Sequence, residues 1–189
     1  YEGRAKAYEN LKRRNIDGLV IIGGDGSFRG AVKFSEEFDI PCIGLAGTID
    51  KDIIGTDFTI GFDTAVNTAV EAIDKIRDTM DAHDRIFIIE VMGRDAGYIA
   101  LHSGIATGAE NILIPERKTI MDDIIDSLLE KERRKKLVNL IVVAEGAELP
   151  DGSFVTQERR QESRQTRLGG IGGVVAYEAR TLTPLGAEA

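Results

Sequence analysis

The feature that most constrains the fold of this chain is a regular alternation of short apolar runs with longer amphipathic segments. The apolar runs are continuous and rich in Val and Ile, as in "GLVIIGG", "RIFIIEVMG" and "LVNLIVVAEG". Such runs are typical of strands buried on both faces, and helices between them indicate parallel βαβ units. We therefore expect an α/β fold, a doubly wound and mainly parallel sheet with helices on both faces. The predicted strands centre near residues 19–22, 41–45, 86–91, 111–114 and 138–144.

Helical patterns fill the segments between these runs. Residues 4–14 suit an amphipathic helix, and residues 97–109 suit a small-residue helix that packs closely. Residues 64–80 repeat their apolar side chains at helical spacing, which places on one face Val66, Ala69, Val70, Ile73, Ile76 and Met80. Residues 119–136 do the same with Ile120, Ile124, Ile125, Leu128 and Leu129. Thr119 and Asp122 resemble a capping box at the start of that last helix.

The alternation stops after Pro150, which divides the chain into two parts. Residues 1–150 carry the predicted α/β core, whereas residues 151–189 are first polar and arginine-rich and then glycine-rich. We expect this tail to be loosely ordered. The alternative is a short terminal element that docks elsewhere.

Composition excludes some classes of partner. The formal net charge is −8, which argues against nucleic acid or an anionic membrane as a bulk partner. No apolar run approaches the roughly 20 residues that cross a bilayer, and the charged start of the chain is not a signal peptide. The single cysteine, Cys42, lies in an apolar run and is expected to be a buried, inert thiol. These observations predict a cytoplasmic protein.

A glycine-rich turn follows the first predicted strand. In "IGGDGS", Gly23, Gly24 and Gly26 allow backbone amides to approach a ligand closely, and the following helix could hold a phosphate at its N-terminus. Asp25 would repel phosphate unless a cation intervened, so the turn favours magnesium bound to a nucleotide. The alternative is a simple turn in which Asp25 caps the helix. The turn is not a P-loop, because no G-K-[ST] follows.

Polar residues also follow the other predicted strands. In "GTIDKD" an extended chain would point Thr48, Asp50 and Asp52 to one side, where a carboxylate could accept a proton from a hydroxyl. Arg94, in "EVMGRDAG", suits a phosphate, and Glu145 suits sugar hydroxyls. Each has an alternative reading. The segment "GTIDKD" could be a solvated turn, Arg94 could form a surface ion pair with Asp95, and Glu145 could be an ordinary loop residue. Because parallel strands bind ligands beyond their carboxyl ends, Asp25, Asp50, Asp52 and Arg94 are predicted to converge on one cleft.

Three stretches together resemble the bacterial ATP-dependent 6-phosphofructokinases: "IGGDGSFRGA", "GTIDKDIIGTDFTIGFDTAVNTAVEAIDKIRDT" and "RIFIIEVMGRDAGYIAL". The resemblance covers about residues 4–149. It implies the phosphofructokinase fold and phosphoryl transfer from MgATP to the 1-hydroxyl of fructose 6-phosphate, which gives fructose 1,6-bisphosphate in glycolysis. It further implies Mg²⁺ as cofactor, ATP as co-substrate, and an allosteric, cytoplasmic homo-oligomer, either a dimer or a tetramer.

The resemblance also gives the motif residues their roles. Asp50 would be the general base, Asp52 would assist near the metal, and Asp25 would bind magnesium. The residues in contact with ATP would be Gly24, Asp25, Gly26 and Ser27. The sugar-phosphate site would comprise Thr48, Ile49, Asp50, Met92, Gly93, Arg94 and Glu145, with Thr48 and Arg94 also catalytic. Arg85 would reach the 6-phosphate in a neighbouring subunit, and an effector site would comprise Arg77, Glu110, Arg134 and Lys136.

Some positions select the donor, and others depart from the family pattern. Pyrophosphate-using relatives carry aspartate and lysine where Gly26 and Gly47 stand, so these glycines favour ATP. The family motif T-I-D-N-D has asparagine where Lys51 stands, and a cation beside Asp50 would lower the pKa of that base unless it pointed to solvent. The family's N-terminal glycine-rich ATP loop and its H-I-Q-R-G-G segment are not found, which suggests a central fragment or a C-terminal end from a shifted reading frame.

Two classes of function follow. The first is a sugar-phosphate kinase. The second is a catalytically inactive fragment, or a ligand-binding or assembly subunit, that retains the fold. A diacylglycerol- or NAD-kinase-like enzyme could share the GGDG turn, but "GTIDKD" and "EVMGRDAG" have no place in it.

Overall fold

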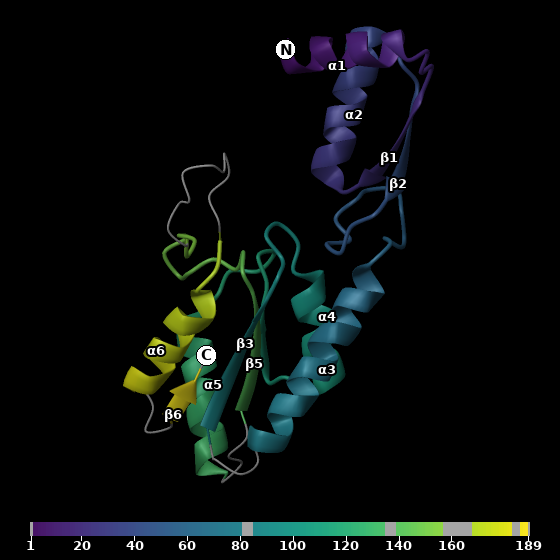
Figure 1. Ribbon diagram of the computed structural model, residues 1–189. Helices are drawn as coiled ribbons and strands as arrows, with labels where there is room; N and C mark the ends of the chain where they lie inside the picture. The colour runs from purple at the N-terminus through teal and green to yellow at the C-terminus, as the bar shows by residue number, and fades with distance from the viewer. Residues whose placement is uncertain (1, 81–84, 135–138, 157–167, 183–185, 189) are drawn as a thin grey trace. The chain divides into compact units, whose positions relative to one another are not determined.

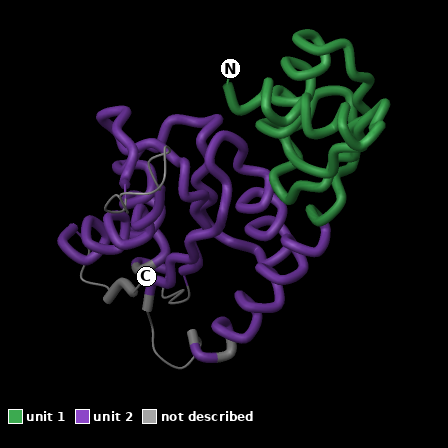
Figure 2. The backbone as a smooth tube through the Cα atoms, turned by 45° about the horizontal axis from the view of Figure 1, so that its top comes forward, with its two compact units in different colours: residues 1–62 green, residues 63–189 purple. Residues whose placement is uncertain are grey.

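The computed structural model describes residues 2–80, 85–134, 139–156, 168–182 and 186–188. The chain forms two compact units, residues 1–62 and residues 63–189, shown in green and purple in Figure 2. Each unit has its own parallel sheet. None of the helices in the described ranges combines the length and the apolarity that crossing a bilayer requires.

The first unit is built around a two-stranded parallel sheet. Strands β1 (Leu19–Gly23) and β2 (Cys42–Ala46) pair from Leu19↔Cys42 to Gly23↔Ala46. Helix α2 (Asp25–Phe38) connects them and lies along the sheet in Figure 1. The ring of Phe28 occupies the space over Gly44, where a Cβ atom would come within 2.9 Å of it. The unit is therefore a βαβ element, as the apolar runs predicted.

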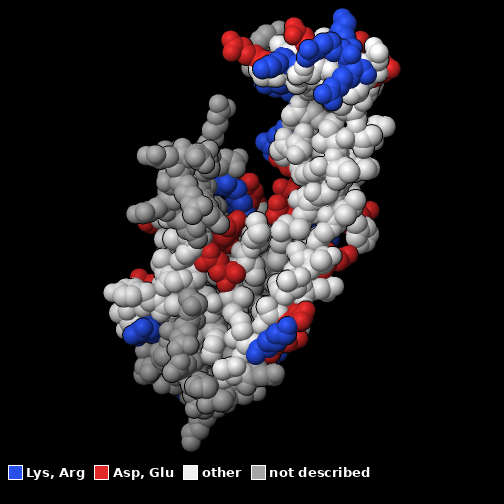
Figure 3. All heavy atoms as spheres, in the orientation of Figure 1, with Lys and Arg blue, Asp and Glu red and all other residues white. Residues whose placement is uncertain are grey.

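Helix α1 (Glu2–Arg13) precedes the sheet and packs against the end of α2. The rings of Tyr8 and Phe38 stack with centroids 4.7 Å apart. Arg4 donates two hydrogen bonds to the Glu37 carboxylate, at 2.7 and 2.8 Å, and this bidentate pair lowers the pKa of Glu37. Figure 3 shows the basic side chains of α1 gathered at this end of the unit.

One face of the β1–β2 sheet differs from the prediction. Both strands were expected to be buried on both faces, but side chains on the face away from Phe28 remain 43–70% exposed. They belong to Val20, Ile22, Ile43 and Leu45. A continuous apolar run indicates that a strand can be buried on both faces. Whether each face is buried depends on whether another element packs against it.

The second unit contains a four-stranded parallel sheet in the order β4–β5–β3–β6. Its strands are β3 (Arg85–Val91), β4 (Asn111–Leu113), β5 (Asn139–Ala144) and β6 (Gly186–Glu188). Its helices are α3 (Phe62–Met80), which begins at the last residue of the first unit, α4 (Tyr98–Thr107), α5 (Met121–Arg133) and α6 (Ile171–Leu182).

Helices cover both faces of this second sheet, as predicted. Alternate residues of β3 and β5, among them Ile88 and Ile141, pack with Leu128 of α5 and Val175 of α6. The other residues of β5, including Val142, pack with α3 and α4. Figure 1 shows these two helix pairs on opposite sides of β3 and β5. All six residues of β5 are buried, which makes it the centre of the core.

The C-terminal part of the chain is more ordered than expected. Where a loosely ordered tail was predicted, α6 buries Ile171, Val175 and Ala179, and β6 pairs in parallel with β3. This corresponds to the alternative, a terminal element that docks. The glycines that suggested disorder instead allow a close approach, because a Cβ atom on Gly172 would lie 3.2 Å from a carboxylate oxygen of Glu90. Residues 157–167 lie outside the described residues. The division between the units falls at Phe62 rather than at Pro150.

The start of α5 also differs from the prediction. The helix begins at Met121, and Thr119 is 3% exposed with no hydrogen-bond partner for its hydroxyl. The proposed capping box between Thr119 and Asp122 is therefore wrong. Ile120 lies outside the helix and is exposed, because the apolar repeat begins one position before the helix does.

Candidate functional site

The glycine-rich turn joins β1 directly to α2. Gly24 is the N-cap and makes no side-chain cap bond, and Asp25 is the first residue of the helix. The alternative in which Asp25 caps the helix is therefore wrong. Its carboxylate instead pairs with Arg29, one turn along α2, at 2.7 Å. A Cβ atom at Gly23 would lie 2.6 Å from the Ser27 hydroxyl, so the turn is this tight only because glycine stands there.

The loop after β2 packs against this turn. A Cβ atom at Gly24 would lie 3.2 Å from the Thr48 hydroxyl, and one at Gly47 would lie 2.7 Å from the side chain of Ile22. The loop closes on itself, because the amide of Ile60 donates to the carbonyl of Ala46 at 2.7 Å. Two glycines thus bring the two strand-end loops of the first unit together.

The segment "GTIDKD" is a turn and not an extended strand end. Lys51 has φ 56°, and the amide of Asp50 donates to the Thr48 hydroxyl at 3.3 Å. The extended backbone that would point Thr48, Asp50 and Asp52 to one side is therefore absent, because Lys51 with its positive φ interrupts it between the two aspartates.

Asp25 and Asp52 line one cavity of about 690 Å³ in the first unit. Arg29 and Lys33, which follow Asp25 at helical spacing along α2, line it as well. Neither cation was singled out from the sequence, although the i, i+4, i+8 series beginning at Asp25 was a signal for them. The cavity therefore brings carboxylates and cations together beside the glycine-rich turn.

The geometry of Asp52 fits a divalent cation. One of its carboxylate oxygens, Oδ1, is buried and has no hydrogen-bond partner, an arrangement that is costly unless something pairs with it. Mg²⁺ is commonly held by one or two carboxylates together with water and substrate phosphates. Within the described residues there is no cluster of three or more His, Cys, Asp or Glu that could hold a metal. Two carboxylates in one cavity therefore fit magnesium that arrives with a nucleotide.

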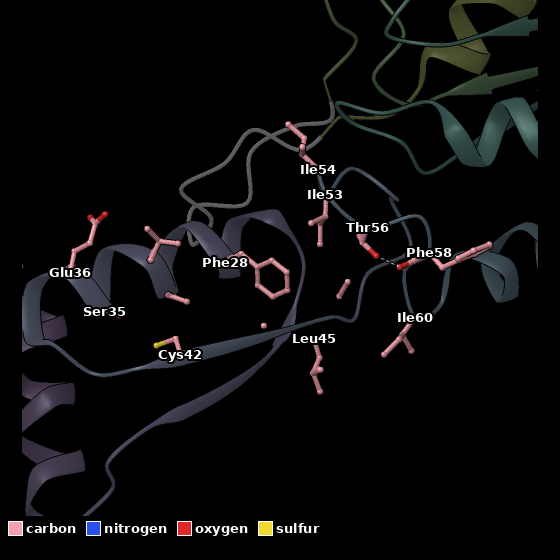
Figure 4. Close-up of a pocket in the computed structure, with 15 residues that line it drawn as sticks. Phe28, Ser35, Glu36, Cys42, Leu45, Ile53, Ile54, Thr56, Phe58 and Ile60 are labelled. Carbon is pink, nitrogen blue, oxygen red and sulfur yellow. Dashed lines mark hydrogen bonds between the residues drawn. The ribbon is translucent and has the colours of Figure 1, made fainter.

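An apolar cavity of about 720 Å³ adjoins this one and shares part of its wall. In Figure 4, Phe28 of α2 and Ile53 of the loop lie on one side of β2, and the side chain of Leu45 points to the other side. Cys42 also lines it and is half-buried, with its sulfur 3.5 Å from the carbonyl of Ile40. The thiol is thus less buried than the sequence suggested.

In the second unit the loops after β3 and β5 are clamped together. The amide of Glu145 donates to Val91 at 2.9 Å, and the amide of Gly146 donates to Gly93 at 3.0 Å. A Cβ atom on Gly146 would overlap the carbonyl oxygen of Arg94. Arg94 and Glu145 therefore lie on neighbouring loops at the carboxyl ends of the strands. Met92, in the loop after β3, is exposed. Arg85 opens β3.

The candidate effector residues are only partly brought together. The carboxylate of Glu110 accepts a hydrogen bond from the amide of Leu140 at 2.7 Å and pairs with Lys131 at 2.8 Å. A guanidinium nitrogen of Arg77 lies 3.6 Å from the position of a Cβ on Gly108, whereas Arg134, one residue beyond α5, pairs with Glu130 of that helix. Lys136 lies outside the described residues. No pattern in the sequence indicated Lys131, because its ion pair with Glu110 depends on tertiary packing.

The predicted convergence of Asp25, Asp50, Asp52 and Arg94 on one cleft stays a prediction, because Asp50 is not among the residues that line the cavity beside the glycine-rich turn. Asp25 and Asp52 share a cavity, and Thr48 packs against the turn that carries Asp25. Arg94 belongs to the second unit, so its place in the same cleft stays a prediction.

Comparison with known proteins extends the resemblance to nearly the whole chain. The model of the family described as Phosphofructokinase matches residues 1–182. The chain is 52% identical to the ATP-dependent 6-phosphofructokinase of Bacillus pumilus and 49% identical to the ATP-dependent 6-phosphofructokinase 2 of Bacteroides thetaiotaomicron. In both cases the match covers 100% of this chain and 60% of the relative. The tail after Pro150 is therefore family sequence, which contradicts the idea of a shifted reading frame.

Solved structures agree with the sequence match. The phosphofructokinase of Saccharomyces cerevisiae superposes with a TM-score of 0.82 at 33% identity, over 99% of this chain and 26% of that one. The pyrophosphate-dependent phosphofructokinase of Nitrosospira multiformis gives 0.73 at 25% identity, over 97% and 46%. The chain spans about three-fifths of the length of the curated relatives. On the family model, the relatives and the shared fold, this chain belongs to the phosphofructokinase family.

Proposed function

We propose that the protein of which this chain is part transfers a phosphoryl group from MgATP to the 1-hydroxyl of fructose 6-phosphate. The observation that carries this proposal is the cavity beside the glycine-rich turn that Asp25 and Asp52 both line, with the Oδ1 atom of Asp52 buried and without a hydrogen-bond partner. The names of relatives about 50% identical support the same reaction. The product is fructose 1,6-bisphosphate, and the process is glycolysis.

The first unit supplies the nucleotide end of the site. Gly24, Asp25, Gly26 and Ser27 begin α2, and free amides at a helix N-terminus suit phosphate oxygens. Asp25 and Asp52 would hold Mg²⁺, which neutralises the charge of the nucleotide phosphates. The Asp50 carboxylate accepts the proton of the attacking sugar hydroxyl, and Thr48 and Ile49 position that sugar.

The second unit supplies the groups that bind the sugar phosphate. The guanidinium of Arg94 stabilises charge on the phosphoryl group. Met92, Gly93 and Glu145 contact the sugar, and the clamp between their loops supports this role. Arg85 serves the site of a neighbouring subunit, which requires a homodimer or homotetramer. Arg77, Glu110, Arg134 and Lys136 form the effector site of a cytoplasmic, allosteric enzyme.

Glycine geometry supports ATP as the donor. A Cβ atom on Gly26 would meet nothing within 4 Å, so an aspartate there would extend into open space at the start of α2. A side chain at Gly47 would press on Ile22. Aspartate and lysine at these positions would narrow the approach of the nucleotide, whereas two glycines leave it open.

A second candidate is a binding or assembly piece without turnover. It would keep the nucleotide end of the site in the first unit, and turnover is the property that distinguishes the two candidates.

ADP formation from MgATP and fructose 6-phosphate tests the first candidate, together with nucleotide affinity measured by calorimetry. Asp50→Ser should lower turnover by about 10²–10⁴-fold and leave nucleotide affinity within a few-fold, because its partner is the sugar hydroxyl. Asp57→Ser, an exposed aspartate of the same loop, is the matched control. Nucleotide binding without turnover would support the second candidate. Loss of ATP binding in Asp50→Ser with turnover preserved would refute the role of Asp50.

A further inference from the structure

Lys51 has an unusual backbone for a residue with a long side chain. Among the described residues, the non-glycine positions with positive φ are Asn15, Asp39 and Lys51. Asn and Asp adopt this conformation more readily than other non-glycine residues, because their short polar side chains can bond to the local backbone. Contacts of the Lys51 side chain are therefore expected to help hold it at φ 56°.

Two aromatic rings meet the Lys51 side chain. Its ammonium lies 5.0 Å from the ring centroid of Phe62 and 5.8 Å from that of Phe58. Both distances are within the range of a cation–π interaction. Phe62, the first residue of α3, is 4% exposed, whereas Phe58 is 74% exposed. Lys51 thus ties the middle of the loop to the segment where the loop returns.

The contact of Lys51 with the two rings lies in the part of the loop that carries the predicted catalytic and metal-binding carboxylates. Asp50 and Asp52 flank Lys51, and the Oδ1 atom of Asp52 is buried without a hydrogen-bond partner. An unsatisfied carboxylate oxygen favours any movement that lets water reach it. The Ala46–Ile60 hydrogen bond closes the base of the loop, and the tie at Lys51 restrains the turn itself.

We propose that Lys51 is a positioning residue, whose ammonium, held over Phe62 and Phe58, fixes the left-handed turn that directs Asp52 into the cavity shared with Asp25. The proposal rests on the proposed function, in which Asp50 and Asp52 act on the substrate and the metal. In this proposal Lys51 acts by fixing the conformation of the loop, and not only by placing a positive charge beside Asp50 and Asp52.

The test uses the 189-residue chain, NMR relaxation of the backbone amides, and Mn²⁺ as the metal probe. Lys51→Met keeps most of the aliphatic stem and removes the ammonium. We expect it to raise the mobility of residues 49–53 and to weaken Mn²⁺ binding, read from broadening of the Asp25 and Asp52 amides, by about two- to five-fold. Lys51→Arg, which retains a cation over the rings, should behave like the wild type. Lys6→Met, which removes a charge from α1, is the control.

The direction in which Mn²⁺ affinity changes distinguishes a positioning role of Lys51 from a purely electrostatic effect of its charge. Removal of a nearby cation should by itself tighten Mn²⁺ binding to carboxylates, so weaker binding in Lys51→Met supports positioning. Phe58→Leu, at an exposed ring, should loosen the same residues and add little in combination with Lys51→Met. The proposal is overturned if Lys51→Met leaves residues 49–53 as rigid as before, if it tightens Mn²⁺ binding, or if Lys51→Arg fails like Lys51→Met. Wild type that binds no Mn²⁺ would refute the metal site of the proposed function, and the relaxation data alone would then decide the role of Lys51.

Discussion

At the scale of single residues, the candidate sites depend on glycines, whose lack of a side chain lets neighbouring loops approach each other. Gly24 leaves room for Thr48, Gly47 leaves room for Ile22, and Gly146 leaves room for the carbonyl of Arg94. None of these three needs a positive φ. At Gly146 and Gly47 atoms of another segment stand where a Cβ atom would lie, and at Gly24 a Cβ atom would make a tight contact. These glycines therefore let loops that carry polar residues come into contact.

Gly146→Ala should therefore be strongly destabilising. The methyl group would overlap backbone atoms of Arg94, which cannot rotate away as a side chain can. We expect a loss of about 3 kcal/mol in the free energy of unfolding, measured by urea denaturation. Gly173→Ala is the matched control, because that helical position of α6 has nothing within 4 Å and should gain about 0.5–1 kcal/mol. Equal effects at the two positions would show that the clamp between the loops is not close-packed.

Reasoning from strand ends placed Asp25 and Asp52 on neighbouring loops, and both line one cavity. Asp50 does not line it and Arg94 belongs to the second unit, so the convergence of all four stays a prediction. The arrangement within "GTIDKD" could not be predicted, because an alternation argument assumes an extended backbone and nothing about lysine announces a left-handed turn. The ion pair of Lys131 with Glu110 joins residues 21 positions apart, and single-sequence patterns do not reach that far.

At the scale of elements, glutamates from neighbouring segments hold the starts of two helices in the second unit. Glu90 of β3 accepts hydrogen bonds from the amides of Gly170 and Gly172, at 2.8 and 2.9 Å, at the start of α6. Glu116 accepts one from Gly97 at the start of α4, at 2.8 Å. A carboxylate at a helix N-terminus satisfies orphan amides and complements the helix dipole. These contacts attach α6 to β3 and α4 to the loop that follows β4.

Glu90→Gln should weaken the attachment of α6. A neutral amide accepts more weakly than a carboxylate and interacts less with the helix dipole, so we expect a loss of about 1–2 kcal/mol. Urea denaturation gives the magnitude, and hydrogen exchange should show faster exchange in α6. Glu71→Gln, which removes an exposed i, i+4 partner of Lys75, should change stability by less than about 0.5 kcal/mol. A Glu90→Gln protein as stable as this control would contradict the capping role.

Elements with continuous apolar runs were predicted to within one or two residues, and β5 was predicted to be buried on both faces. The pattern failed for α6, because "IGGVVA" has too many glycines for a helix by local propensity. Packing against β3 and capping by Glu90 supply the stability that the local sequence lacks. Tertiary contacts of this kind do not appear in a local pattern.

At the scale of the whole molecule, the buried core is divided unevenly between the two units. Both large clusters of buried apolar side chains lie in residues 63–189. In the described part of residues 1–62 the buried apolar side chains are Phe34, Ile40 and Phe62. The parallel topology of both sheets was predictable from the alternation of strands and helices. Their division into two units was not, because the boundary falls at the start of a helix and no composition change marks it.

This uneven core predicts different local stabilities. A unit of about 60 residues seldom gains more than about 3–5 kcal/mol from one core, and here Val20, Ile22 and Ile43 leave one face of its sheet exposed. In hydrogen exchange followed by mass spectrometry, the amides of β1 and β2 should exchange at least about tenfold faster than those of β5, because local opening costs less where fewer apolar groups are buried.

Ile141→Ala, in the centre of β5, should lower the free energy of unfolding by about 2–5 kcal/mol and speed exchange in β3 and β5. Ile43→Ala, at a 65% exposed position, should change stability by less than about 0.5 kcal/mol. Exchange in β1 and β2 as slow as in β5 would mean that the exposed face is covered in solution, and Ile43→Ala would then be as destabilising as a core substitution.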